Sequence, residues 1–130
     1  MVYADVCEAF FIERLNRFVA RVELDGRAEL CHVKNTGRCR ELFIPGARCH
    51  VQRFAPGQRK TALDLIAVWK GERLVNVDSQ APNRVFREWV EGGGLLPGPA
   101  RVRAEYTYRN SRFDFLIESG GHRALVEVKG

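Results

Sequence analysis

The sequence has few of the features that mark secreted, membrane-bound or zinc-binding proteins. No apolar run approaches the length of a membrane-spanning helix. Residues 1–14 lack the basic start of a signal peptide, and the apolar run 9–12 is too short for its hydrophobic region. The four cysteines contain no Cys-x-x-Cys pair, which argues against a zinc ribbon. We therefore expect a soluble, cytoplasmic chain with reduced thiols and no contact with a membrane.

The cysteines still leave two interpretations open. Cys31-His32, Cys39 and Cys49-His50 could converge on a metal ion. Buried thiols without a ligand role are the simpler interpretation, because unpaired cysteine is among the most buried residue types.

Lysine is also scarce, with four residues against seventeen arginines in a chain of 130 residues and net charge +5. The planar guanidinium group matches the geometry of phosphate, so this bias favours a polyanionic partner such as DNA. Basic residues concentrate between positions 34 and 60, where Glu41 is the single acid. On a small domain this segment would bind phosphates and release counterions. The predicted DNA-binding residues are Lys34, Arg38, Arg40, Arg48, Arg53, Arg59 and Lys60.

Three aromatic residues, Phe43, Phe54 and Trp69, lie in or near this basic segment. They could stack on nucleic-acid bases or belong to the core. For Trp69, which sits in an apolar run, we favour the core.

The first part of the chain predicts a small β-barrel. Alternating apolar and polar residues, separated by turn signals such as Asp25-Gly26 and Pro56-Gly57, are typical of short strands. Five strands in close succession are the number found in an OB-fold, so we predict an OB-like β-barrel domain over residues 1–80. The strands are expected at 17–24, 27–33, 48–54, 61–69 and 73–77.

Residues 81–130 predict a different architecture. Apolar residues at helical spacing indicate a helix over 83–91 with Asn83 as its N-cap, ended by Gly92-Gly93-Gly94. A strand at 102–108 and a terminal hairpin then form a β-meander. The fold class expected for the whole chain is α+β.

The terminal hairpin is expected to turn at Gly120-Gly121, since this pair supplies the positive φ values of a two-residue turn. Ser119 then pairs with His122, and the same register places Asp114 opposite Glu127. One face carries the core side chains Phe113, Phe115, Ile117, Ala124, Val126 and Val128.

Two facing carboxylates destabilise a hairpin unless something compensates their repulsion. A hard divalent cation, Mg²⁺ or Mn²⁺, would do so through Asp114 and Glu127, with Lys129 beside it to orient water or stabilise phosphate charge. This is the D…E-x-K pattern of the PD-(D/E)xK restriction-endonuclease-like nucleases, and Glu88 in the preceding helix is a candidate third ligand. The alternative is a polar sheet face on which Glu127 pairs with Lys129 or Arg112.

Several spaced motifs together resemble the sugar fermentation stimulation protein A (SfsA) family. They are Arg17-Phe-Val-Ala-Arg-Val, His32-Val-Lys-Asn-Thr-Gly, Pro45-Gly46, Val75-Asn-Val with Pro82-Asn-Arg, and Ser111-Arg-Phe-Asp-Phe-Leu with Glu127-Val-Lys.

The resemblance implies an N-terminal OB-like domain followed by a restriction-endonuclease-like domain, of which residues 81–130 would be the N-terminal part. It also implies non-specific DNA binding linked to regulation of sugar utilisation, with nuclease activity inferred from the motif. Two hypotheses follow: a DNA-binding regulatory module, or a metal-dependent endonuclease that hydrolyses phosphodiester bonds with Asp114, Glu127 and Lys129. The exposed edge of the meander could in addition support a homodimer.

Overall fold

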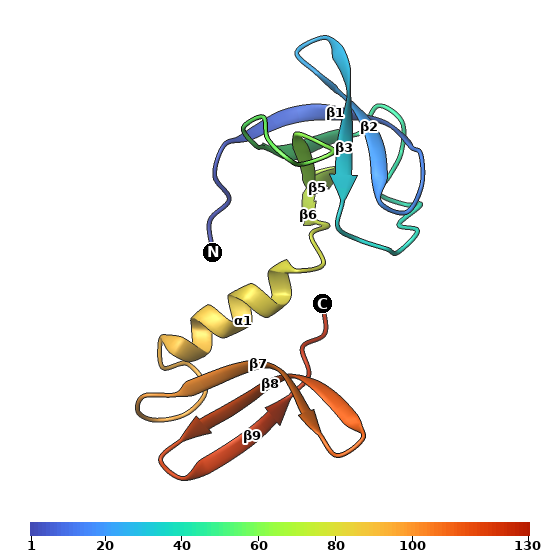
Figure 1. Cartoon of the computed structure of the whole chain (residues 1–130). Coiled ribbons are helices and arrows are strands. Elements are labelled where there is room, and N and C mark those ends of the chain that lie inside the picture. Colours follow the sequence, from blue (N-terminus) through green and yellow to red (C-terminus); the bar gives the residue numbers. More distant parts are fainter. The chain divides into compact units, whose positions relative to one another are not determined.

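The computed structural model describes residues 1–130, which divide into two compact units (Figure 1). One unit comprises Val2–Ser79, and the other comprises Gln80–Gly130 together with Met1. No helix is long and apolar enough to cross a membrane.

The unit of residues 2–79 is a closed five-stranded barrel with one extra strand. Hydrogen bonding follows the order β3-β2-β1-β4-β5, and β3 then pairs in parallel with β5 to close the barrel. This is the connectivity of an OB-fold, and the predicted α+β class with an OB-like barrel is confirmed. The strands are β1 (Val6–Arg14), β2 (Val19–Leu24), β3 (Arg27–Val33), β4 (Arg48–Arg53), β5 (Leu63–Lys70) and β6 (Arg73–Asn76).

The number of barrel strands was predicted correctly, but one member was wrong. The predicted fifth strand at 73–77 is β6, which only forms a hairpin with the end of β5. The missing barrel strand is β1, whose alternation is obscured by exposed Phe10 and by a register shift between Phe11 and Glu13. At that shift the backbone of Phe11 bonds instead to Gly46 and Ala47, with N···O distances of 2.7 and 2.8 Å.

The barrel core comes from inward-facing residues of all five strands. β5 is buried along most of its length, because β4 lies on one edge while β3 and β6 share the other. Phe11 stacks on Phe43 with ring centroids 5.4 Å apart, so the β3–β4 loop also covers the core. The buried core residues are Ala9, Phe11, Ala20, Val22, Cys31, Val33, Cys49, Val51, Leu63, Leu65, Val68 and Val77.

Lys34, Asp64 and Asp78 form a buried network of ion pairs in the barrel unit. The Nζ of Lys34, just after β3, lies 2.8 Å from Asp78 and 3.5 Å from Asp64. Asp78 also accepts a hydrogen bond of 2.9 Å from the hydroxyl of Tyr3. A second cation, Arg59, pairs with Asp64. These partners offset the desolvation of two almost fully buried carboxylates.

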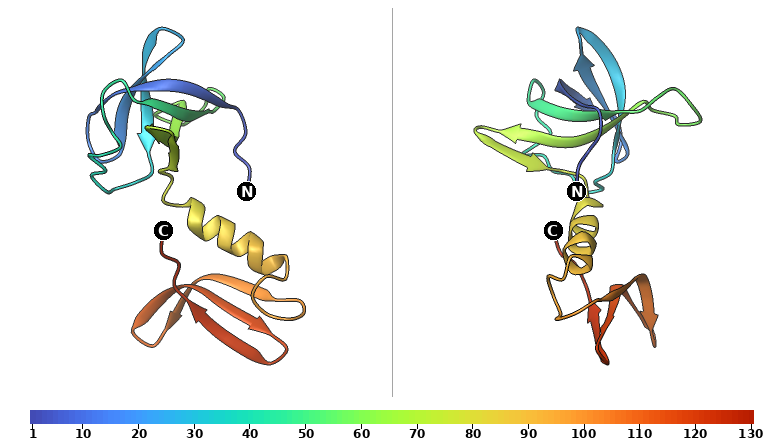
Figure 2. Two further views of the ribbon diagram at one scale, coloured as in Figure 1. Left: turned by 180° about the vertical axis from the view of Figure 1, so that it is seen from behind. Right: turned by 90° about the vertical axis from the view of Figure 1, so that its left-hand side faces the viewer.

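The unit of residues 80–130 is a three-stranded antiparallel meander with one helix on a face of the sheet (Figure 2). Helix α1 packs through Val90 and Phe86, and the ring of Phe86 lies 5.4 Å from that of Phe115. Val85 and Trp89, on the adjacent stripe of the helix, are exposed. The elements are α1 (Ala81–Glu91), β7 (Arg101–Tyr108), β8 (Ser111–Ser119) and β9 (His122–Val126).

The start of the helix differs from the prediction. Gln80 occupies the N-cap position, and Asn83, expected there, lies inside the first turn. Pro82 near the first position has no N–H to leave unsatisfied and fixes a helical φ, so it starts the helix without a side-chain cap. The C-terminal end at Gly92 is as expected.

The hairpin register is confirmed. Ser119 pairs with His122, and the ladder continues to Phe115–Val126. Phe115 and Ile117 are buried on the core face with Ala124, Val126 and Val128 packed against them, whereas the predicted Phe113 is only half-buried outside this cluster.

Candidate nucleic-acid interface and acidic site

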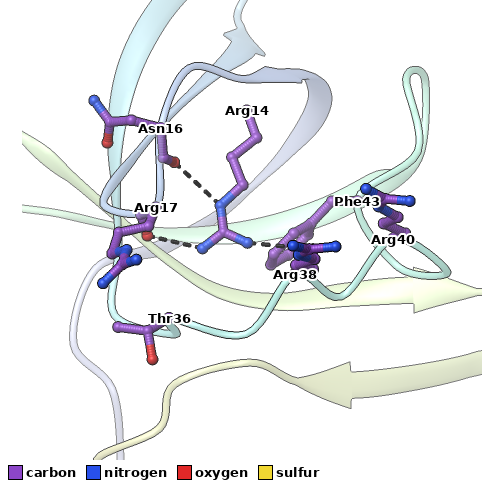
Figure 3. Close-up of a pocket in the computed structure, with 7 residues that line it drawn as sticks. All are labelled: Arg14, Asn16, Arg17, Thr36, Arg38, Arg40 and Phe43. Carbon is purple, nitrogen blue, oxygen red and sulfur yellow. Dashed lines mark hydrogen bonds between the residues drawn. The ribbon is translucent and has the colours of Figure 1, made fainter.

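A basic pocket of about 600 Å³ lies on the barrel unit between two loops (Figure 3). One wall comes from the end of β1 and the β1–β2 loop, and the other comes from the loop between β3 and β4. No carboxylate lines it. We call it the arginine pocket; its lining residues are Arg14, Asn16, Arg17, Thr36, Arg38, Arg40 and Phe43.

Arg14 joins the two walls. Its guanidinium group donates hydrogen bonds to backbone carbonyls on both loops, among them that of Arg17 at 2.7 Å and those of Asn16 and Arg38 at 3.2 Å each. The carbonyls of Asn35 and Gly37 are further acceptors. Every hydrogen-bond acceptor of Arg14 is a backbone carbonyl. Arg14 therefore fixes the two loops, and no acid balances its positive charge.

The turn in the second wall also depends on local bonding. The side-chain oxygen of Asn35 accepts a hydrogen bond of 2.9 Å from the N–H of Gly37. A Cβ atom at Gly37 would lie 2.9 Å from that same oxygen, so a larger residue there would displace the Asn35 side chain from this bond. This tight turn brings Thr36 and Arg38 to the pocket.

Arg17, Arg38 and Arg40 form no ion pair within the chain, and all three are exposed. Together with Arg14 they give the pocket four guanidinium groups without an acidic partner. Figure 3 shows the side chains of Arg38 and Arg40 on the β3–β4 loop beside Phe43. The arrangement can bind an anion with several oxygen atoms, since each guanidinium presents paired N–H donors.

The other predicted DNA-binding residues are placed differently. Lys34 is held by Asp78 and Asp64, and Arg59 by Asp64. Arg48 lies 3.7 Å from Glu8, and Arg53 lies 3.1 Å from Asp5. Lys60 is exposed in the β4–β5 loop. Only Arg38 and Arg40 of the predicted set therefore reach the pocket.

Arg14 and Arg17 were missed because they lie outside the dense basic segment 34–60. The barrel brings the end of β1 beside the loop after β3, which sequence proximity does not show. One sequence feature could have indicated Arg17, because it directly follows Asn16, a residue type common in turns. The side-chain oxygen of Asn16 accepts a hydrogen bond of 2.8 Å from the N–H of Phe18 in that turn.

Each of the three aromatic residues that could stack on bases already has an arginine guanidinium near its ring. The Cζ atom of Arg59 lies 3.8 Å from the centroid of the Phe54 ring, and that of Arg48 lies 5.1 Å from that of Trp69. Phe43 has Arg14 at 5.0 Å and stacks on Phe11. It belongs to the core rather than to a surface on which bases could stack.

The four cysteines differ in burial and are not gathered with other potential ligand side chains. No group of three or more His, Cys, Asp or Glu side chains is assembled to hold a metal ion. Cys31 and Cys49 are fully buried in the barrel core, whereas Cys7 and Cys39 are half-buried. Burial raises the pKa of Cys49 to about 12, and burial also raises that of Cys31. The prediction of buried free thiols is confirmed for Cys31 and Cys49.

Asp114 meets the E-x-K segment in a manner the sequence did not predict. The β8–β9 ladder ends at Phe115–Val126, so Asp114 and Glu127 do not form the expected strand pair. Instead, the backbone N–H of Val128 donates to Oδ2 of Asp114 at 2.7 Å, while Asn83 of α1 donates to Oδ1 at 3.2 Å. These two bonds hold the carboxylate between the helix and the chain after β9.

The neighbours of Asp114 in the motif are exposed. Lys129 donates from Nζ to Glu127, and this hydrogen bond, followed by the charge of Glu127, raises the pKa of Lys129. This ion pair is the alternative predicted for a polar face. Glu88, the candidate third ligand, is exposed on α1 and pairs with the N-terminal amine of Met1.

Each of the two units matches a family model of known proteins. Residues 12–77 match the family model of the SfsA N-terminal OB domain, and residues 80–130 match that of the sugar fermentation stimulation protein RE domain. Sugar fermentation stimulation protein homologs of Desulfitobacterium hafniense and Ruminiclostridium cellulolyticum are 54% and 52% identical over the full 130 residues. The chain spans 57% and 58% of the lengths of these relatives.

A solved structure of Pyrococcus furiosus SfsA in complex with Ca²⁺ superposes with a TM-score of 0.84 at 30% identity. The match covers 98% of this chain and 55% of that one. With family models matched over both units and relatives above 50% identity, the chain belongs to the sugar fermentation stimulation protein A (SfsA) family.

Proposed function

We propose that this chain binds DNA through its phosphates, with the arginine pocket as the principal contact. The observation that carries the proposal is that Arg14, Arg17, Arg38 and Arg40 line one pocket whose lining contains no acid. Elsewhere on the barrel the basic residues Arg48, Arg53 and Arg59 are paired with carboxylates. The pocket therefore brings four basic residues together without a carboxylate in its lining.

Binding of this kind is independent of sequence. Phosphate contacts position a protein on DNA without distinguishing bases. Phe43, the aromatic residue in the pocket, has one face on Phe11 and a cation near its ring. Base stacking therefore adds little selectivity there. Given the names of the relatives, we place this DNA binding in the regulation of sugar utilisation.

Salt titrations of DNA binding test the proposal. We expect two unrelated duplexes with 5′-hydroxyl ends to bind alike, with log K falling linearly against log salt. In the double variant Arg38→Gln/Arg40→Gln the slope should become shallower by about 0.9 for each phosphate that the protein no longer neutralises. The matched control Arg27→Gln/Arg73→Gln removes two exposed arginines outside the pocket. Equal slopes in the two double variants would show that charge, rather than the pocket, governs binding.

A metal-dependent phosphodiesterase is the second candidate function, favoured by the bond between the N–H of Val128 and Asp114. This bond holds Asp114 against the backbone of the Glu127–Lys129 segment, which is the neighbourhood that a D…E-x-K site needs. The solved relative in complex with Ca²⁺ supports a site for a hard cation in this family.

The donors at this place fit Mg²⁺ or Mn²⁺ in chemistry, because Asp114 and Glu127 offer carboxylate oxygens and such ions retain several waters. When bound, the ion would supply a water of lowered pKa and neutralise phosphate charge. Asn83 and the Val128 N–H would orient Asp114 for this. Lys129, whose pKa is raised by Glu127, would act as a cationic donor to phosphate rather than as a base.

A further inference from the structure

The arginine pocket differs in shape and charge from an ordinary DNA-binding surface. It is a concave pocket of about 600 Å³, a size typical of small-ligand sites, whereas duplex phosphates are spread along an extended backbone. A smaller hollow of about 200 Å³ on the same unit has one acid, Glu29, and one base, Arg53, in its lining. Of these two hollows, only the arginine pocket combines concavity with unbalanced positive charge.

The charge of the pocket exceeds what one phosphodiester group, with a single negative charge, can balance. A phosphate monoester carries a charge of about −1.5 to −2 at pH 7 and three strong acceptor oxygens. Arg17, Arg38 and Arg40 come from both walls and have no competing acid. Thr36 also lines the pocket and is neutral. This set of donors suits a compact dianion.

The frame of the pocket is also fixed before any ligand arrives. Arg14 bonds both loops through backbone carbonyls, and Gly37 is locked against Asn35. Arg14 is thus a positioning residue that also adds positive charge to the pocket. A rigid frame lowers the entropic cost of gathering several arginines around one anion.

From this geometry we propose that the arginine pocket is a phosphate-monoester site that takes a dianionic terminal phosphate. The phosphate could belong to the end of a DNA strand, which deepens and rests on the proposed DNA binding, or to a small phosphorylated molecule. The chemistry recognised is the same in both cases: a compact group with two negative charges, bound by guanidinium groups from two loops.

Oligonucleotide binding tests the strand-end source. Anisotropy titrations compare one labelled single strand bearing a 5′-phosphate with the same strand bearing a 5′-hydroxyl, at about 0.15 M salt. We expect the phosphorylated strand to bind about tenfold more tightly, since the hydroxyl end cannot accept charge-assisted bonds from the guanidinium groups. Arg38→Gln/Arg40→Gln should remove this preference, and Arg27→Gln/Arg73→Gln should keep it. Unchanged thermal melting shows that the variants are folded.

Ribose 5-phosphate tests the small-molecule source by calorimetry, with ribose as the neutral control. Binding of ribose 5-phosphate to the wild type and the Arg27→Gln/Arg73→Gln variant, but not to the Arg38→Gln/Arg40→Gln variant, supports the site even when strand ends give no preference. Absence of both effects overturns the inference. If both effects are absent, continued binding of 5′-hydroxyl duplexes would leave the proposed function intact. If ribose 5-phosphate binds and DNA does not, the phosphate-monoester site stands and the proposed DNA binding fails.

Discussion

Individual arginines in this chain have three distinct roles, which their sequence neighbours do not reveal. Arg14 holds backbone carbonyls, Arg48 and Arg53 pair with exposed acids, and Arg38 and Arg40 carry uncompensated charge at the pocket. A count of basic residues between 34 and 60 treats them alike. Function at this scale depends on which acid, if any, the fold places within reach of each guanidinium group.

Asp114 gives the first prediction at the residue scale. Its two oxygens accept from Asn83 and from the N–H of Val128, so Asp114→Asn removes the negative charge that strengthens both hydrogen bonds. We expect a loss of about 1 kcal/mol in the free energy of unfolding without metal. Mn²⁺ should raise the melting temperature of the wild type by mass action and leave that of the variant unchanged.

Glu105→Gln is the control for Asp114, because Glu105 is an exposed acid of the same unit that pairs with Arg112 at 2.8 Å. Its response to Mn²⁺ should equal that of the wild type. The same proteins are assayed for nicking of supercoiled DNA with Mn²⁺, which Asp114→Asn should abolish. A wild type that Mn²⁺ neither stabilises nor activates would exclude a metal site made by this chain.

Cys49 gives a prediction about alkaline pH. Burial raises the pKa of its thiol to about 12, so the folded protein keeps the neutral form. In the unfolded chain the thiol ionises from about pH 9, and only that state is then stabilised. The contribution of Cys49 is thus fully present below about pH 9 and is lost as pH rises toward 12, at up to about 1.4 kcal/mol per pH unit.

Urea unfolding at about pH 8 and about pH 10.5 measures this contribution. Between those values the wild type should lose about 2 kcal/mol more stability than Cys49→Ala does. Cys39→Ala, which retains Cys49, should show the pH dependence of the wild type. A Cys49→Ala variant with the wild-type pH dependence would contradict the assignment.

Among the elements, the terminal hairpin was predictable and the strand β1 was not. The Gly120-Gly121 turn and period-two alternation fix the register of β8 and β9 without help from the rest of the chain. β1 instead combines exposed Phe10 with a bulge, so its alternation fails locally while its pairing with β2 and β4 fixes its place. The residue at which β9 ends was also not predictable from the sequence. It depends on the hydrogen bond from the N–H of Val128 to Asp114, which is a tertiary contact.

The turn itself supports a matched pair of substitutions. Gly120 and Gly121 have φ values of +56° and +80°, and a Cβ at either would meet no atom within 4 Å. Backbone conformation therefore decides the outcome. Gly120→Asn should be neutral or slightly stabilising, since asparagine tolerates this region and suits the first position of the turn. Gly121→Val should lose about 1–2 kcal/mol, because a β-branched residue is strained there.

Chemical denaturation of the two hairpin variants gives the comparison. A Gly121→Val variant as stable as Gly120→Asn would mean that the turn adopts another conformation.

At the scale of the whole molecule, the two units differ in how much core each contains. Twelve buried residues form the barrel core, whereas Val90, Phe115 and Ile117 are the fully buried members of the other. The barrel also closes on itself through β3 and β5. The pocket, which draws on β1 and the β3–β4 loop, depends on that closure, and this is why sequence alone found only half of its arginines.

The final prediction concerns the barrel as an independent unit. A fragment of residues 1–79 should unfold cooperatively, since its core and its charge network lie within it. A fragment ending at Val77 keeps every strand but lacks Asp78, the partner 2.8 Å from the mostly buried Lys34. Lys34 keeps Asp64 at 3.5 Å, so the shorter fragment loses one of two acid partners and should lose about 1.5–3 kcal/mol in the free energy of unfolding.

Lys34→Met in both fragments separates the ion pair from mere chain length. If the pair explains the difference, the two fragments should become nearly equal in stability once the lysine is replaced, because the coupling between the lysine and Asp78 is then absent from both. A full difference that persists in the Lys34→Met fragments would assign it to other contacts of Asp78 and Ser79. Loss of cooperative melting by the 1–79 fragment itself would show that the barrel needs residues 80–130 to fold.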